Sequence, residues 1–370
     1  MGGPSNRAAS LRCHRRAIEI LSDLPVAENP DYLADLGAAW VNLGCALQAG
    51  DGRESLHEAL GASDRAIEFL GRLPIGAHPR FRHNLAAAWM GRADVLARID
   101  AASGRAEALC SYGRAIEIAR DLPLDEKASF RILFASCWIN RGNLLQAMGG
   151  AEALSAAVGS YDAALAALGN LPQSGHRLAG HRSATAWTNR GEAHLRLAQC
   201  DSAGKAAHSA RMALAQIEGG GPEMPASAER GLGALRVLAR ALESLPSGAN
   251  RVAELTDIAE QGVELALGFR DRATDLFDPL VAWFFSFGCR VYGRWQPQFL
   301  AEFIDDVLRR LDSRPGPAFG MELRAIARRA LAGTLEGLCG NRLIVGGSPQ
   351  TERLLRTVGE LRAAAARLDA

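Results

Sequence analysis

Lysine is almost absent from this sequence, because only Lys127 and Lys205 occur among its 42 basic residues. We interpret the arginine bias as GC-rich bacterial coding rather than as selection for a function of arginine. The formal net charge is +1 and no basic run occurs, so the electrostatic footprint of a nucleic-acid or anionic-membrane binder is missing. We therefore expect neither nucleic acid nor a membrane as a partner.

Paired cysteines and long apolar runs are also missing. The seven cysteines form no CxxC pair, which indicates reduced thiols rather than disulfides. The most apolar stretch, 279–289, is bounded by Asp278 and Arg290 and is too short to span a bilayer. The first ten residues contain no apolar signal-peptide core. These absences predict a soluble cytoplasmic protein.

Motifs of catalysis and metal binding are absent as well. All eight histidines precede residue 210, and none has the i, i+4 or CxxC spacing of a metal site. Cys13 and His14 are adjacent, so on a helix their side chains diverge and cannot form a nucleophile–base pair. Gly346-Gly347 follows no predicted strand, which excludes a phosphate loop. We expect no catalytic residue, no metal and no cofactor, and hence no enzyme.

An internal repeat is the dominant positive feature. Trp40, Trp89, Trp138 and Trp187 lie 49 residues apart, as do four Leu-Pro pairs that begin at Leu24. Two alanine columns have the same spacing: Ala59, Ala108, Ala157 and Ala206, and Ala17, Ala66, Ala115, Ala164 and Ala213. A repeat of this length predicts a solenoid in which each unit packs only on its neighbours.

Helical periodicity divides each repeat into two helices. We predict A helices, each with one tryptophan, at 30–49, 79–99, 126–148 and 176–199, and B helices at 8–22, 54–72, 103–121, 152–170 and 203–217. Trp40, Leu43, Gly44 and Leu47 share one face of a helix, which we expect to be the packing face. The alanine columns predict close approach of the B helices.

These stretches resemble the tetratricopeptide repeat over residues 8–217. The segments from Ala39 to Leu47, Trp138 to Gly142 and Trp187 to Gly191 resemble its first helix, and Ala108, Tyr112, Ala115 and Leu122-Pro123 its second. The resemblance implies a right-handed superhelix with a peptide-binding groove. A standard repeat has about 34 residues, and Gly91, Arg92 and Ala93 replace the expected Asn, Leu and Gly. These departures put ordinary groove dimensions in doubt.

Residues 219–370 form the second predicted region, a helical cap. After the break at Gly219 to Pro222 the period fades, and we expect helices at 226–244, 250–268, 273–293, 297–312, 319–339 and 349–368. Nine of the 22 aromatic residues lie between Phe277 and Phe303. We interpret them as the core of this cap; the alternative is an exposed docking patch.

Candidate partner-binding residues lie on the face of the A helices opposite the packing face. Asn42, Asn140 and Asn189 follow their tryptophans by two residues, and in tetratricopeptide proteins the matching Asn often holds a peptide backbone through its amide. The alternative is that these amides bond within the repeat or face water. Other polar residues expected on this side are Asn143, Glu192, Arg196, Asp94, Arg98, His83 and His181. The two histidines have a solvated-surface alternative.

Three functions follow from this pattern. We first predict a scaffold that holds a protein or peptide segment in its concave groove. The alternative is an accessory or regulatory subunit that docks on an enzyme through its aromatic C-terminal helices, and the least supported is an enzyme or small-molecule sensor. Arg92, Arg141 and Arg190 form another column, for which we favour packing over ligand contact.

Overall fold

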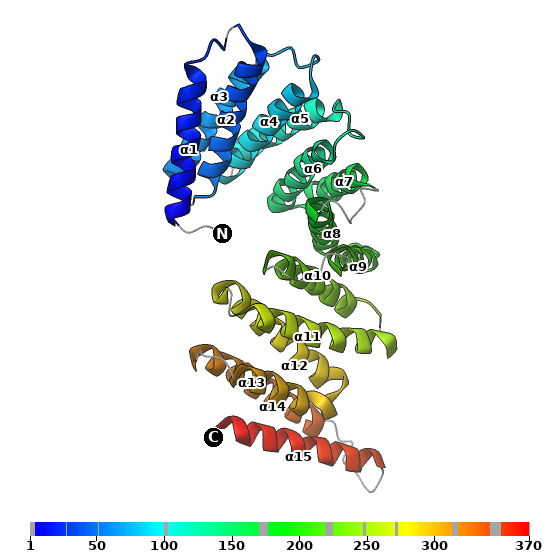
Figure 1. Ribbon diagram of the computed structural model, residues 1–370. Coiled ribbons are helices and arrows are strands. Elements are labelled where there is room, and N and C mark those ends of the chain that lie inside the picture. Colours follow the sequence, from blue (N-terminus) through cyan, green and yellow to red (C-terminus); the bar gives the residue numbers. More distant parts are fainter. Residues whose placement is uncertain are drawn as a thin grey trace. The chain divides into compact units, whose positions relative to one another are not determined.

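The computed structural model describes residues 4–26, 28–50, 52–99, 103–169, 177–218, 225–246, 249–270, 273–312, 317–340 and 349–369. Over these ranges the chain is helical and contains no strand (Figure 1). The elements are α1 (Pro4–Ser22), α2 (Pro30–Gln48), α3 (Arg53–Gly71), α4 (Pro79–Ile99), α5 (Ser103–Arg120), α6 (Ala128–Met148), α7 (Ala151–Leu168), α8 (Arg177–Leu197), α9 (Ser202–Glu218), α10 (Pro225–Ser244), α11 (Ala249–Arg270), α12 (Thr274–Trp295), η1 (Pro297–Phe299), α13 (Leu300–Asp312), α14 (Pro317–Gly340) and α15 (Pro349–Asp369). The predicted all-α fold is confirmed.

The chain divides into two compact units, Met1–Ser202 and Ala203–Ala370. By its contacts, α9 therefore groups with the C-terminal unit. The predicted boundary after residue 218 follows the fading of the sequence period and stays a prediction. No described helix combines the length and the apolar character that crossing a bilayer requires.

Local sequence explains where the helices of the N-terminal unit begin and end. Pro30 occupies the first turn of α2, and Asn29 caps it by accepting a hydrogen bond from the Asp31 N–H at 2.9 Å. Gly149 and Gly150 have φ angles of 75° and 80°, which glycine tolerates best, and they join α6 to α7 in a tight turn. Short connections of this kind place consecutive helices side by side and antiparallel.

Alanine and tryptophan pack the N-terminal unit. Ala59, Ala108 and Ala157 have no exposed surface, and at Gly44 a Cβ would lie only 3.6 Å from the Ala59 carbonyl oxygen. Trp40 and Trp138 are half-buried, and each contacts two successive hydrophobic clusters. Trp89 does the same between them. The predicted packing face is confirmed, with the indoles as links between clusters rather than as centres of them.

The A helices face the inside of the N-terminal unit. Besides their own B partners, α2 contacts α4, α4 contacts α6, and α6 contacts α8, while no comparable contact joins successive B helices in the described residues. Helices that approach each other along one side of a stack make that side concave. The A helices therefore form the inner wall, by which we mean their face with the residues two and five positions after each tryptophan.

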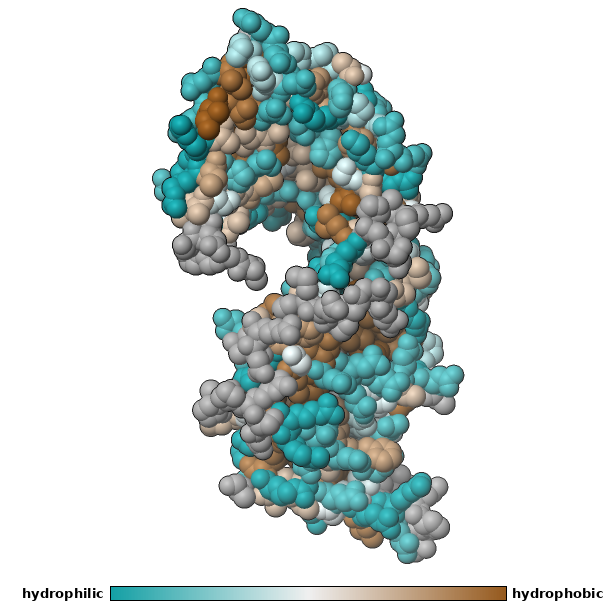
Figure 2. All heavy atoms as spheres, viewed as in Figure 1, coloured by the Kyte–Doolittle hydropathy of each residue, from teal (hydrophilic) through white to brown (hydrophobic). Residues whose placement is uncertain are grey.

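The C-terminal unit has a concentrated aromatic core. Phe277, Phe284, Phe285 and Phe287 are fully buried. Hydrophilic residues cover much of the outer surface in view in Figure 2. Burial confirms the interpretation of this cluster as a core, and the alternative of an exposed aromatic docking patch is wrong, because only Phe299, at 46%, is a strongly exposed phenylalanine of the cluster.

Candidate functional site

Two predicted partner-binding asparagines join successive A helices. The Asn140 Nδ2 on α6 donates to the Asp94 Oδ1 on α4 at 2.9 Å, and the Asn189 Nδ2 on α8 donates to the Asn143 Oδ1 on α6 at 2.8 Å. Each bond joins the residue two positions after a tryptophan to the residue five positions after the preceding tryptophan. We call this series of bonds the amide ladder. The structure thus places Asn140 and Asn189 in contacts within the unit, as the alternative interpretation expected.

A tyrosine from the B helix completes each of these two rungs. The Tyr112 hydroxyl on α5 donates to the Asp94 Oδ1 at 2.5 Å. Forty-nine residues later, the Tyr161 hydroxyl on α7 is 2.9 Å from the Asn143 Oδ1 and 2.8 Å from the Gln146 Oε1. The Asp94 Oδ1 therefore accepts from the next A helix and from the B helix, while in the next rung the single Tyr161 proton is shared between two acceptor oxygens. Three helices are tied together at every rung.

Asp94 is the only acidic member of a complete rung. Burial raises its pKa to about 6, and the hydrogen bonds from Tyr112 and Asn140, with the charges of Arg182 and Arg98, oppose that rise. Burial also raises the pKa of Tyr112, and the Asp94 charge raises it further. At the matching place in the next rung the neutral Asn143 accepts from Asn189 and lies 2.9 Å from the Tyr161 hydroxyl. Arg182 lies on α8, two A helices beyond Asp94 on α4.

The ladder has one open end and one gap. Asn42 on α2 is exposed, and its amide has no partner among the described residues. Gly91 has no side chain to form a rung, and here the Gln48 Nε2 approaches the Gly91 carbonyl oxygen at 3.4 Å. Glu192, five positions after Trp187, is partly buried at the far end on α8.

Arg98 and Arg196 bond to the ends of preceding A helices. The Arg98 guanidinium donates to the carbonyl oxygens of Gln48, at 2.5 Å, and Gly50, at 3.2 Å, at the C-terminus of α2. Arg196 donates to the Gln146 carbonyl oxygen of α6 at 2.7 Å. A cation at this end satisfies unpaired carbonyls and interacts favourably with the helix dipole. Both side chains remain exposed on the inner wall.

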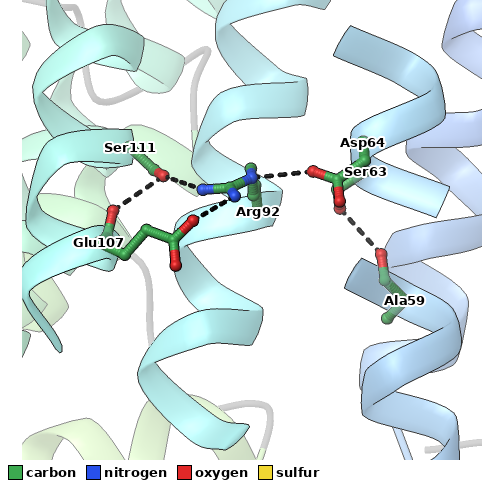
Figure 3. Close-up of polar contacts among 6 residues, drawn as sticks. All are labelled: Ala59, Ser63, Asp64, Arg92, Glu107 and Ser111. Atoms are coloured by element: carbon green, nitrogen blue, oxygen red, sulfur yellow. Dashed lines mark hydrogen bonds and ion pairs between the residues drawn. The ribbon is translucent and has the colours of Figure 1, made fainter. Parts of the chain in front are cut away.

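The arginine column faces the B helices. Arg92 extends from α4 between α3 and α5, as Figure 3 shows, and donates to Asp64 at 2.8 Å, Glu107 at 2.5 Å and Ser111 at 2.9 Å. Arg190 repeats the aspartate contact with Asp162 at 2.6 Å, and Arg141 repeats the serine contact at 2.7 Å. Each guanidinium also lies over the tryptophan three residues before it, at 5.4 to 5.9 Å. These contacts agree with the packing interpretation.

The predicted histidines lie apart from the ladder. His83 packs its ring at 5.6 Å from that of Phe130, and both line a cavity of about 340 Å³ with Lys127. Burial lowers the pKa of His83, and the Lys127 charge adds to this effect. His181 on α8 is partly buried, and its carbonyl oxygen accepts the Thr185 hydroxyl at 2.9 Å. Neither contact tests a partner-binding role, which stays a prediction for both.

The tyrosines are the site residues that sequence analysis missed. Tyr112 and Tyr161 are 49 residues apart, and the residues five after the tryptophans, Asp94 and Asn143, are both polar. Two polar columns three residues apart on one helix face, with a hydroxyl column on the adjoining helix, were the available signal. In the described residues no group of histidine, cysteine, aspartate and glutamate side chains has the arrangement of a metal site.

Comparison with solved structures supports the fold. The crystal structure of BtubC (BKLC) from P. vanneervenii is similar over 71% of this chain and 92% of that chain, with a TM-score of 0.54 and 15% sequence identity. This chain is a helical repeat protein. A circular tandem repeat protein with novel repeat topology and enhanced subunit contact surfaces aligns over 97% of this chain and 89% of its own, with a TM-score of 0.34 and 15% identity.

Sequence comparison gives no family. No protein-family model matches the chain, and no curated protein matches it. The helical repeat fold therefore rests on the structure.

Proposed function

We propose that this protein is a tetratricopeptide-type scaffold without enzymatic activity, whose inner wall holds a segment of a partner protein. The observation that carries the proposal is the row of amides along successive A helices. The ladder uses the amide Nδ2 groups of Asn140 and Asn189 to fix these side chains in place. A fixed amide loses little conformational freedom on binding, which favours affinity.

The amides of this row differ in which hydrogen-bonding groups they leave free for a peptide. Asn42 and Asn143 are exposed, so the whole amide of Asn42 and the Nδ2 group of Asn143 face solvent on the inner wall. An extended backbone presents alternating N–H and C=O groups, and a side-chain amide can pair with both. Asp94, with its pKa of about 6, sits among these amides as an acceptor that ionises in the neutral range. An extended segment crossing α2, α4, α6 and α8 is the occupant that this row fits.

Site-specific photocrosslinking tests the proposal without disturbing the ladder. A photoreactive residue in place of Asn42 or Cys45, which take no part in the ladder, reports the inner wall, and matched positions Arg65 and Arg114 on α3 and α5 report the outer B helices. All four side chains are exposed. We expect crosslinked adducts in cells of the source organism from the two inner positions only. Adducts from the B-helix positions alone, or from none of the four, would refute the assignment.

The double substitution Asn140→Ala with Asn189→Ala is a weaker test, since it also removes two bonds of the ladder. Asn42→Ala is cleaner, because its amide has no partner in the described chain. We expect Asn42→Ala to weaken capture of the crosslinked partner while the thermal unfolding curve stays unchanged. Glu68→Ala on the outer face of α3 is the matched control.

A further inference from the structure

The C-terminal unit contains a second place where a partner could bind, separate from the inner wall. A cavity of about 790 Å³ opens between α12 and α14, with Glu243 of α10 at its edge. This volume lies within the range of about 300–1,000 Å³ that ligand sites occupy. On α14 the lining extends from Ile326 to Leu338, which at 1.5 Å per residue is about 18 Å. The space is therefore long enough for roughly five or six extended residues.

Positive charge dominates the rim of this cavity. Arg290 and Arg294 of α12 and Arg329 of α14 line it, against the single carboxylate of Glu243. The Arg290–Glu243 pair is long, at 3.7 Å. In the described part of the chain neither Arg294 nor Arg329 forms an ion pair, whereas Arg92 and Arg190 of the N-terminal unit do. Guanidinium groups in this situation are available to carboxylates, which they bind through paired hydrogen bonds.

Glycines keep the floor of the cavity open. Gly333 and Gly337 of α14 line it, and a Cβ at either would meet nothing within 4 Å. Gly262 and Gly288 of this unit behave differently: a Cβ would lie 2.0 Å from Phe284 at Gly262 and 2.3 Å from Phe303 at Gly288, so those two glycines admit a packed ring. Glycine weakens a helix interior, yet at Gly333 no packing within the chain accounts for it. The missing side chains leave room for an occupant.

Trp295 argues for carboxylates over nucleobases. It lines the same cavity, and its ring already has the guanidinium of Arg294 at 4.8 Å and that of Arg251 at 5.5 Å. Single-stranded nucleic acids are held by bases stacked on free aromatic faces. This indole is occupied by arginine instead, while the charges on the rim remain available.

We propose that the α12–α14 cavity is a docking site for an acidic peptide segment of a partner protein. The segment lies along α14 over Gly333 and Gly337, and its carboxylates pair with Arg294 and Arg329. Arg290, with its long pair to Glu243, contributes a third positive charge. The site is independent of the inner wall, so either can fail without the other.

Fluorescence anisotropy of the full chain with a labelled peptide of alternating glutamate and alanine tests this site at low salt. We expect Arg294→Glu with Arg329→Glu to weaken binding at least about tenfold, since two charge-assisted pairs become repulsive. Arg353→Glu with Arg362→Glu on α15 makes the same change in net charge and is expected to have a much smaller effect. Both of those side chains are exposed.

A steric variant separates the cavity from general surface charge. Gly333→Leu fills the floor without altering charge and should also abolish binding, whereas Gly359→Leu on α15, where a Cβ likewise meets nothing within 4 Å, should not. Circular dichroism verifies that each variant is folded. The proposal is overturned if Gly333→Leu binds the peptide like the wild type or if the α15 charge variant loses as much affinity. It is also overturned if a single-stranded oligonucleotide of equal charge binds more tightly than the peptide.

Discussion

The two units stabilise stacked helices in different ways. In the N-terminal unit small contacts recur along the repeats: alanines at the helix crossings, a half-buried indole in each A helix, two rungs of the amide ladder and, in the last three A helices, an arginine over the indole. In the C-terminal unit the large apolar side chains gather in one place, around Phe277, Phe284, Phe285 and Phe287. A distributed design spreads the cost of losing one residue, whereas a concentrated core makes a few residues indispensable.

The sharpest test of this comparison is Phe284→Ala. The ring is fully buried, fits against Gly262 and lies 4.9 Å from that of Trp283. We expect a loss of about 3–5 kcal/mol in the unfolding free energy of the C-terminal unit. Hydrogen exchange should accelerate throughout α11 and α12 and stay unchanged in α4 and α6. Phe299→Ala, at an exposed phenylalanine, is the control, and equal effects of the two would contradict a concentrated core.

A smaller loss is expected when one repeat loses its arginine. Arg92→Ala removes the links to Asp64, Glu107 and Ser111, and the Arg92 side chain is only 18% exposed. We expect a cost of about 2 kcal/mol, below that of a fully buried charge network because the carboxylate partners reach solvent. Chemical denaturation measures it. Arg65→Ala, which breaks only an exposed pair with Glu68, should cost about 0–0.5 kcal/mol.

The third expected effect is a gain in stability. The pKa of Asp94 is about 6 in the folded protein against an ordinary value of 3.8, so the folded state binds this proton more tightly. Stability from this group is therefore present below about pH 4 and is lost as the pH rises through about 6. Asp94→Asn should stabilise the protein by about 1–2 kcal/mol at pH 7.5.

The gain from Asp94→Asn should vanish near pH 4, where the aspartate is protonated. Thermal unfolding of the variant and the wild type across this pH range measures the difference. Loss of stability in Asp94→Asn at neutral pH would show that the aspartate charge itself supports the ladder.

The smallest expected effect concerns the bonds at helix ends. Arg98→Ala removes an exposed guanidinium from the last carbonyls of α2, which we expect to cost about 0.5 kcal/mol. Faster hydrogen exchange limited to the last turn of α2 is the measurable result. Arg12→Ala on α1 is the exposed control. A large global loss from Arg98→Ala would mean that the repeats depend on one another more strongly than the distributed design implies.

Periodicity accounts for how much of this fold could be predicted. The helices, the packing face and the alanine crossings follow from hydrophobic spacing, because those positions are selected for burial wherever the neighbouring helix lies. The fate of Asn140 and Asn189 could not be settled in the same way, since an amide column serves a peptide and a neighbouring helix equally well. These two roles are distinguished only by the approach of successive A helices, which brings Asn140 to Asp94.

The α12–α14 cavity lay beyond reach of the sequence for a different reason. It depends on which faces of two helices diverge after a core of large rings has formed, and no period fixes that geometry. Arg294, Arg329 and Gly333 are spread over 40 residues and form no motif. The aromatic cluster, in contrast, was predictable as a core because nine large rings in 27 residues cannot all remain at the surface.

The amide ladder also bears on how the number of repeats can change in evolution. Each rung takes its amide donor from one repeat and its acceptor from the repeat before it. A repeat inside the array therefore contributes a donor to one rung and an acceptor to the next. A duplication of 49 residues inside the array would arrive with both halves already matched to its neighbours, whereas an insertion of another length would leave a carboxylate or an amide stranded. Growth and contraction by whole copies are thus the changes that this architecture tolerates in evolution and in the hands of an engineer.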